Sequence, residues 1–105
     1  MIEEIRTQVQ PLYETKELLG FSVLNDHGGM VHNESFLSDE AARASAAVFM
    51  GCRQNMLSAG RKLKRFIVEL DDVILVYCLN QAGHTVFTLD RDCNLDAAAA
   101  LLVPV

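Results

Sequence analysis

Histidines and cysteines are the residues of this chain that could bind a metal ion or act as nucleophiles, and there are three of each. They are His27, His32, His84, Cys52, Cys78 and Cys93. A zinc site commonly takes two closely spaced ligands from one turn, and a nucleophilic thiol needs a base beside it. The sequence has no C-x-x-C pair and no comparable local arrangement. We therefore expect no metal, no cofactor, no catalytic residue and no enzymatic activity.

The cysteines have structural interpretations instead. Cys52 and Cys78 lie in apolar patterns, so we expect them to be small core residues. Cys93, beside Asp92, is the only thiol that we expect to reach solvent. An odd number of cysteines without paired spacing indicates reduced thiols.

Turn-forming residues explain the remaining polar motifs. The Gly28-Gly29 pair connects two expected strands, so no helix N-terminus follows it to hold a phosphate, and a hairpin turn accounts for it. The Asp71-Asp72 pair is typical of a turn more than of a cation site. We also expect His27 and His84 on turns and His32 on a short edge strand.

The strongest charge feature is the segment from Arg61 to Arg65, in which every residue except Leu63 is Lys or Arg. The chain as a whole has a net charge of −5, which argues against a general nucleic-acid or anionic-membrane role. Two interpretations of the basic segment remain open. Its charges either guard an edge strand as a solvated loop, or attract an acidic partner surface or membrane headgroups.

Length and composition fit a single domain over residues 1–105, with 50% apolar and 22% charged residues. The first residues lack the charged-then-apolar order of a secretion signal, and no apolar run approaches the ~20 residues that span a bilayer. Together with the unpaired cysteines, these features predict a cytoplasmic protein without a transmembrane segment.

Apolar periodicity and turn signals predict eight elements in the order α-β-β-α-β-β-β-α. These are a helix within 1–18 that Pro11 should kink or end, strands 18–24 and 30–33, a long helix 38–60, strands 63–70, 73–79 and 84–89, and a final helix 95–103 that Pro104 terminates. Strand 73–79 is apolar at every position, so it must be covered on both faces. We predict an α+β fold, a three-layer α/β/α sandwich. The long helix covers one face of a five-stranded antiparallel sheet, and the terminal helices cover the other.

The long helix is expected to begin at the N-cap Ser38 and to close at Gly60 in a left-handed conformation. A helical wheel places one arc against the sheet, formed by Ala41, Ser45, Val48, Phe49, Cys52 and Met56. On one side of this arc the apolar surface continues with Ala46, Met50 and Leu57. On the other side lies a ridge of small residues, formed by Ala44, Ala47, Gly51 and Ser58. A helix that is apolar nearly all round must be buried nearly all round, which one short chain cannot do alone.

This surplus of apolar surface predicts a dimer. Gly51 in mid-helix costs about 1 kcal/mol relative to Ala, which indicates close approach by another backbone. The alternative is that the small residues only relieve crowding against the chain's own sheet.

Strand 63–70 supports the dimer because it is expected to form a sheet edge that can pair with another chain. Antiparallel pairing about Ile67 would place Arg65 opposite Glu69 of the second copy. The expected dimer interface comprises Ala44, Ala47, Met50, Gly51, Gln54, Arg65, Ile67 and Glu69.

The element order and turn pattern resemble the roadblock domain family. The resemblance is carried by residues 20–31 leading into the capped alanine-rich helix, 66–70, 73–79, 86–89, and Asn94-Leu95 before the last helix. It covers essentially the whole chain, as a pattern of hydrophobicity and turns with few fixed residues. It implies a non-enzymatic domain that dimerises through its long helix and third strand, and that binds small Ras-like GTPases or scaffolds larger complexes.

Our leading hypothesis is a homodimer that binds and regulates a small Ras-like GTPase. The expected contacts with that partner are Arg43, Met50, Gln54 and Leu57. The alternative is a scaffold or dynein-light-chain-type subunit that assembles with another roadblock-like chain, without direct GTPase regulation. A small-ligand sensor is less well supported, because the mixed-size apolar pattern leaves little room for a cavity.

Overall fold

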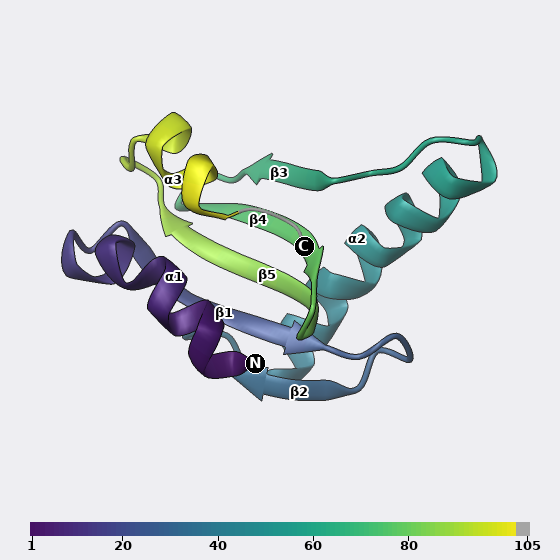
Figure 1. Ribbon diagram of the computed structural model, residues 1–105, viewed down its shortest axis with the longest axis horizontal. Coiled ribbons are helices and arrows are strands. Elements are labelled where there is room, and N and C mark those ends of the chain that lie inside the picture. Colours follow the sequence, from purple (N-terminus) through teal and green to yellow (C-terminus); the bar gives the residue numbers. More distant parts are fainter. Residues whose placement is uncertain (103–105) are drawn as a thin grey trace.

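A five-stranded antiparallel sheet lies between two layers of helices (Figure 1). The computed structural model describes residues 1–102, and the elements are α1 (Ile2–Glu14), β1 (Leu18–Leu24), β2 (Met30–Asn33), α2 (Asp39–Ser58), β3 (Arg65–Glu69), β4 (Val73–Asn80), β5 (Gly83–Asp90) and α3 (Leu95–Leu101). This order and the predicted sandwich are confirmed. The expected helix end at Val103 and its terminator Pro104 lie outside the described residues.

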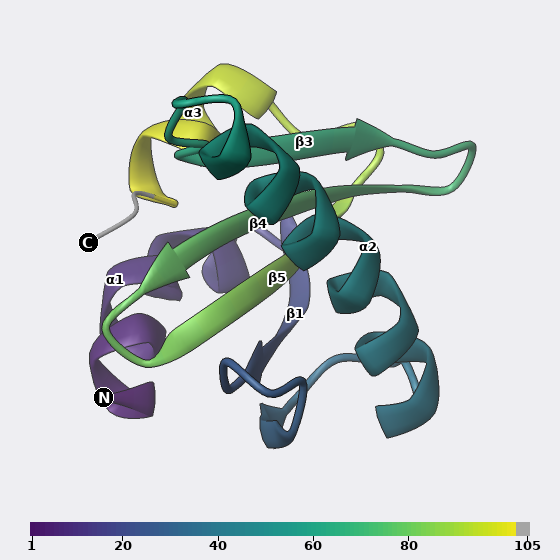
Figure 2. The ribbon, with the colours of Figure 1, turned by 90° about the vertical axis from the view of Figure 1, so that its right-hand side faces the viewer.

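The strand order β2-β1-β5-β4-β3 leaves β2 and β3 at the two edges of the sheet. Helix α2 covers one face, and α1 and α3 cover the other, as a view from the side shows (Figure 2). The predicted assignment of the long helix and the terminal helices to opposite faces is therefore confirmed.

Strand β4 is buried from Val73 to Cys78 without interruption, which confirms that both of its faces are covered. Side chains of a strand alternate between the two faces of a sheet. Ile74 and Val76 accordingly pack in the core shared with α1 and α3, whereas Leu75 and Tyr77 pack in the core shared with α2.

Helix α2 has the predicted signals at both ends. The Ser38 hydroxyl accepts a hydrogen bond from the Ala41 N–H, as an N-cap should. Gly60 adopts a φ of 77°, and its N–H donates to the Leu57 carbonyl oxygen at 3.0 Å, while the Arg61 N–H donates to the Met56 carbonyl oxygen at 2.8 Å. These bonds form a Schellman motif, which satisfies the last carbonyl groups of the helix.

Pro11 does not end helix α1, which continues to Glu14. The apolar stripe on this helix is buried on both sides of the proline, at Ile5, Val9 and Leu12. Its packing against the sheet holds the helix together, although proline removes one backbone hydrogen bond. The helix closes instead at Lys16, whose φ of 63° gives the left-handed conformation usually taken by glycine.

The burial predicted for the cysteines is confirmed for Cys78 and wrong for Cys52. Cys78 is buried as expected, and this burial raises its pKa to about 11. Cys52 and Cys93 are both half-buried, so Cys93 is not alone in reaching solvent, and Cys52 is not a core residue. Burial, followed by the negative charge of Glu17, also raises the pKa of Cys93. Raised thiol pKa values make both Cys78 and Cys93 poor nucleophiles at neutral pH.

Candidate functional site

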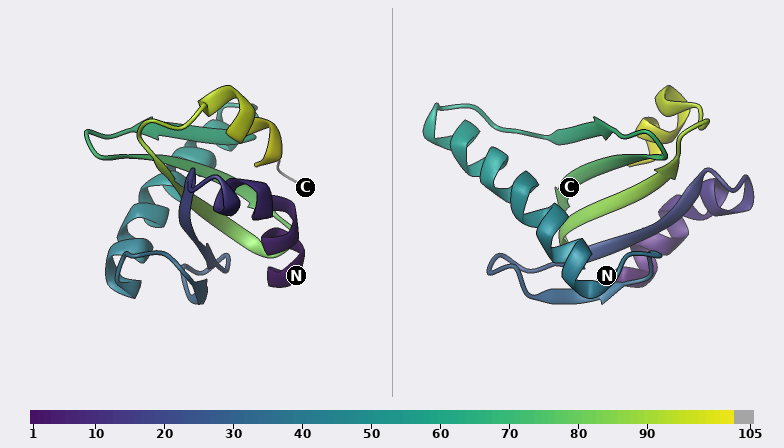
Figure 3. Two further views of the ribbon diagram at one scale, coloured as in Figure 1. Left: turned by 90° about the vertical axis from the view of Figure 1, so that its left-hand side faces the viewer. Right: turned by 180° about the vertical axis from the view of Figure 1, so that it is seen from behind.

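The C-terminal half of α2 extends past the sheet without cover (Figures 1 and 3). The buried side chains of this helix are Ala42, Ala46 and Phe49. Every residue from Gln54 to Gly60 is exposed. The described residues thus leave most of the surface of α2 open to solvent or to another protein.

Phe49 fixes the rotation of α2 about its axis. Its ring stacks on the ring of Tyr77, with the two centroids 5.5 Å apart, and its centroid lies 5.2 Å from that of the Phe66 ring. The arc predicted to face the sheet was wrong at Val48 and Met56, which are 64% and 46% exposed. A wheel of a helix that is apolar nearly all round does not define one inward face, and here the largest side chain selects it.

The side chains expected at the two interfaces lie mostly on the open surface of α2. Ala44, Ala47, Gly51 and Gln54 from the dimer set and Arg43 and Leu57 from the partner set are exposed, and Met50 is half-buried. A Cβ added at Gly51 would meet no atom within 4 Å. Crowding inside this chain therefore does not explain the glycine.

Strand β3 presents an open row of backbone groups. The Leu70 N–H donates to the Val73 carbonyl oxygen at 2.8 Å, which makes this the hydrogen-bonded pair that closes the β3–β4 hairpin. Hydrogen-bonded and non-hydrogen-bonded pairs alternate along an antiparallel ladder. The N–H and C=O groups of Arg65, Ile67 and Glu69 consequently point away from β4. These three residues are the members of the predicted dimer interface that lie on this strand.

The side chains of β3 separate by face. Phe66 and Val68 pack in the core beneath α2, so Arg65 and Ile67 lie on the opposite face, with Ile67 42% exposed. Arg65 Nη1 donates to the carbonyl oxygen of Ala99 in α3 at 2.5 Å. A cation is favoured there because the C-terminus of a helix carries partial negative charge. No local sequence pattern predicts this contact, because it joins residues 34 positions apart.

A chain of polar contacts on the α2 face of the sheet joins the buried side chains of Tyr77 and His84 to the exposed Asp26. His84 is 4% exposed within β5, so the expectation that it sits on a turn was wrong. Its Nδ1 lies 2.5 Å from Tyr77 Oη and its Nε2 lies 2.9 Å from Asp26 Oδ1. With Nε2 protonated, the imidazole donates to Asp26 and accepts from Tyr77, which satisfies both nitrogens. Burial raises the pKa of Tyr77 to about 12, so the phenol remains a donor at neutral pH.

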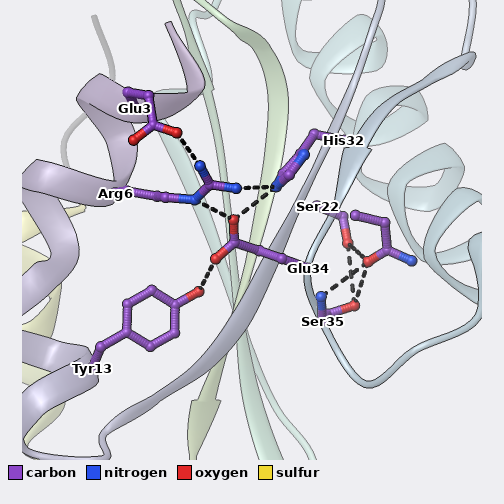
Figure 4. Close-up of polar contacts among 8 residues, drawn as sticks. Glu3, Arg6, Tyr13, Ser22, His32, Glu34 and Ser35 are labelled. Carbon is purple, nitrogen blue, oxygen red and sulfur yellow. Dashed lines mark hydrogen bonds and ion pairs between the residues drawn. The ribbon is translucent and has the colours of Figure 1, made fainter.

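A second polar cluster joins α1 to the end of β2 (Figure 4). One of its members is His32, whose predicted position on a short edge strand is confirmed. Glu34 accepts hydrogen bonds from Tyr13 Oη at 2.6 Å and Arg6 Nε at 2.9 Å, and its Oε1 lies 2.7 Å from His32 Nε2. Burial raises the pKa of the Glu34 carboxyl, but the hydrogen bonds from Tyr13, His32 and Arg6 and the charge of Arg6 outweigh it. The net pKa lies below the ordinary value of 4.5. Burial, then the bond to Glu34, raises the pKa of Tyr13.

Glu34→Gln is expected to lower the free energy of unfolding by about 1 kcal/mol at neutral pH, because it removes the charged acceptor shared by three donors. A carboxyl with a depressed pKa contributes stability that is complete above its unfolded pKa and is lost as the pH falls through the folded value. Urea unfolding from about pH 7 down to pH 3 should therefore show the two proteins converging below 4.5. A constant difference across that range would contradict the assignment.

The polar clusters of the described residues tie elements together and do not form a metal site. Within residues 1–102, no group of three His, Cys, Asp or Glu side chains is arranged to hold a metal ion. Nor is any helix in that range long and apolar enough to cross a membrane. The open face of α2 and the open edge of β3 are thus the principal candidate site.

Several solved structures have the same arrangement of elements, and they include Roadblock/LC7 domains. A Roadblock/LC7 domain from Streptomyces avermitilis matches 97% of this chain and 91% of its own length, with a TM-score of 0.64 and 20% identity. Myxococcus xanthus MglB matches 95% of this chain and 80% of its own, with a TM-score of 0.69 and 11% identity. MglC from the same organism matches 93% and 89%, with a TM-score of 0.53 and 19% identity.

These likenesses define the class: the chain is an α/β/α sandwich with the roadblock/LC7 fold. Neither a scan of protein-family models nor a search of curated proteins finds a match. At identities of 11% to 20% the similarity establishes the fold and does not identify a binding partner.

Proposed function

We propose that this chain is a non-enzymatic interaction module that forms a homodimer through α2 and β3, and that the dimer binds and regulates a small Ras-like GTPase. One observation carries the proposal: an uncovered helix and an open sheet edge are adjacent in the same molecule. Phe49 of α2 contacts Phe66 of β3, so a partner that pairs with the strand also reaches the helix.

A second copy fits both surfaces. Antiparallel pairing of two β3 strands would satisfy the outward backbone groups of Arg65, Ile67 and Glu69 and continue the sheet through both copies. The same pairing brings the two α2 helices near each other. Their ridge of small residues, with Gly51 at its centre, allows backbones to approach closely.

The GTPase part of the proposal comes from the resemblance to roadblock domains and from a strip of α2 beside that ridge. Arg43, Met50, Gln54 and Leu57 follow one another round the helix within a narrow arc. Exposed Leu57 and half-buried Met50 supply apolar contact area, and Arg43 supplies a cation. Such a mixture is typical of a protein-binding surface.

The test is a binding measurement with purified small Ras-like GTPases, each loaded with GDP or with a GTP analogue. Charge reversal through Arg43→Glu with Gln54→Glu should weaken binding by at least about tenfold while leaving the dimer intact. Gln10→Glu with Lys16→Glu is the matched control, because it makes the same change in net charge at two exposed positions in and just after α1, which packs on the other face of the sheet. Unchanged binding in the double variant would exclude this surface.

The scaffold alternative predicts a different oligomeric state for the purified chain. A chain that is a monomer or aggregates alone, and becomes soluble only when produced with another roadblock-like chain, would overturn the homodimer. A stable homodimer measured by sedimentation would support the proposal.

A further inference from the structure

Opposite charges lie at the two ends of strand β3. Residues 41–68 contain six of the nine Lys and Arg residues of the chain and no Asp or Glu. The strand is entered from a basic loop, defined here as Arg61, Lys62 and Lys64, and it leads into an acidic turn, defined here as Asp71 and Asp72. Neutralising charges are thus absent from the sequence around the basic loop.

Both groups of charges are exposed and unpaired within the described part of the chain. Within residues 1–102, no side chain of the basic loop or of the acidic turn makes an ion pair or a hydrogen bond. Arg91 contacts the backbone of the acidic turn, where its Nη1 donates to the carbonyl oxygen of Asp71 at 3.5 Å. The Arg91 guanidinium also lies 3.9 Å from the carboxylate of Asp92, so it is shared between two partners.

Antiparallel pairing places the beginning of one strand beside the end of the other. In the register about Ile67, each residue before Ile67 faces the residue equally far after it in the second copy. Lys64 then faces Leu70, and Lys62 faces Asp72. The basic loop of each copy would therefore lie beside the acidic turn of the other, once at each end of the paired strands.

We propose that the basic loop is the docking site for the acidic turn of a second copy of this chain, so that two reciprocal charge contacts fix the antiparallel register and select self-association. This inference rests on the proposed dimer. It assigns a role to the basic segment, for which the sequence left a solvated loop, an acidic partner or a membrane open. Parallel pairing would instead bring the two basic loops together and the two acidic turns together, which like-charge repulsion disfavours.

The experiment exchanges the charges between copies. One variant carries Arg61→Glu, Lys62→Glu and Lys64→Glu, and the other carries Asp71→Lys and Asp72→Lys. Each variant alone places like charges at both contacts, so its dimer dissociation constant should rise at least about tenfold. An equal mixture places opposite charges at both contacts again, so it should form heterodimers of nearly the affinity of the unmodified dimer.

Controls separate charge docking from folding and from net charge. Glu4→Lys with Glu14→Lys changes net charge by the same amount as the acidic-turn variant, at exposed positions of α1, and should leave dimerisation unchanged. Asp71→Asn with Asp72→Asn keeps side chains that suit a turn and should weaken the dimer by less than the lysine variant. Circular dichroism establishes that each chain is folded.

The salt dependence of the dimer affinity is an independent test. Raising NaCl from about 50 mM to about 500 mM should weaken the unmodified dimer several-fold and strengthen the dimers of both charge variants, because screening reduces attraction and repulsion alike. If the unmodified chain is a monomer, the dimer itself is wrong. If it is a dimer whose affinity the charge variants leave unchanged, only the docking is wrong. Loss of binding to vesicles of anionic lipid in the loop variant, with an unaltered dimer, would assign the loop to membranes and overturn the proposal.

Discussion

An Ile67→Pro chain is expected to be a folded monomer. The N–H of Ile67 points away from β4, so a proline at this position removes no hydrogen bond of the chain's own sheet. In the proposed dimer the same N–H donates to the second copy, and the symmetric arrangement loses two such bonds at the centre of the interface. Two lost backbone bonds, with the neighbouring chain displaced, should raise the dimer dissociation constant by about 100-fold.

Val68→Pro is the matched control one residue further along β3. By the same alternation its N–H donates to β4, and its side chain packs in the core beneath α2. Proline there should destabilise the fold by several kcal/mol, at about the cost of a proline inside a regular element. Sedimentation velocity and thermal unfolding separate the two outcomes. A dimeric Ile67→Pro chain would refute edge pairing, and an unfolded one would refute the alternation assigned to β3.

The elements were predictable where local signals agree with one another. Ser38 and Gly60 bracket α2 because a hydroxyl caps the first turn and a glycine tolerates the left-handed closing conformation. The unbroken apolar run of β4 required cover on both faces, which determined the three layers. In each case the information lies within one element and its immediate flanks.

The rotation of α2 about its own axis could not be predicted from the sequence of the helix alone. Apolar and small residues surround this helix, so several rotations bury a comparable set of side chains. The rings of Tyr77 and Phe66 select the rotation that buries Phe49, and both come from strands later in the chain. Val48 was therefore assigned to the wrong side.

The polar clusters escaped prediction because their members are distant in sequence. Arg6 and Glu34 are separated by 28 positions, and His84 and Asp26 by 58. His84 was expected on a turn, but its pairing with Leu24 of β1 places it in the sheet and buries it. For the candidate interface, composition indicated which residues are small or apolar, whereas only the fold shows which of them remain uncovered.

Gly51→Arg is expected to give a folded chain that no longer dimerises. The position is exposed and a Cβ there meets no atom within 4 Å, so the larger side chain fits the isolated chain without a clash. Between two closely approaching α2 helices it would hold the backbones apart and bring two cations together. The dimer dissociation constant should rise by more than about 100-fold, the effect of placing an unpaired charge in a packed interface.

Gly51→Ala tests the same contact with a single methyl group and gives effects of opposite sign in the two states. In a chain made monomeric by Ile67→Pro, alanine should raise the free energy of unfolding by about 1 kcal/mol, because glycine is a poor helix former. In the dimer the added methyl group should weaken association, because it fills the space that allows the backbones to meet. Gln10→Leu, an exposed change on α1, should alter neither measurement appreciably. If alanine stabilises the monomer and leaves the dimer affinity unchanged, the glycine is not at the contact, and α2 meets its partner through another face.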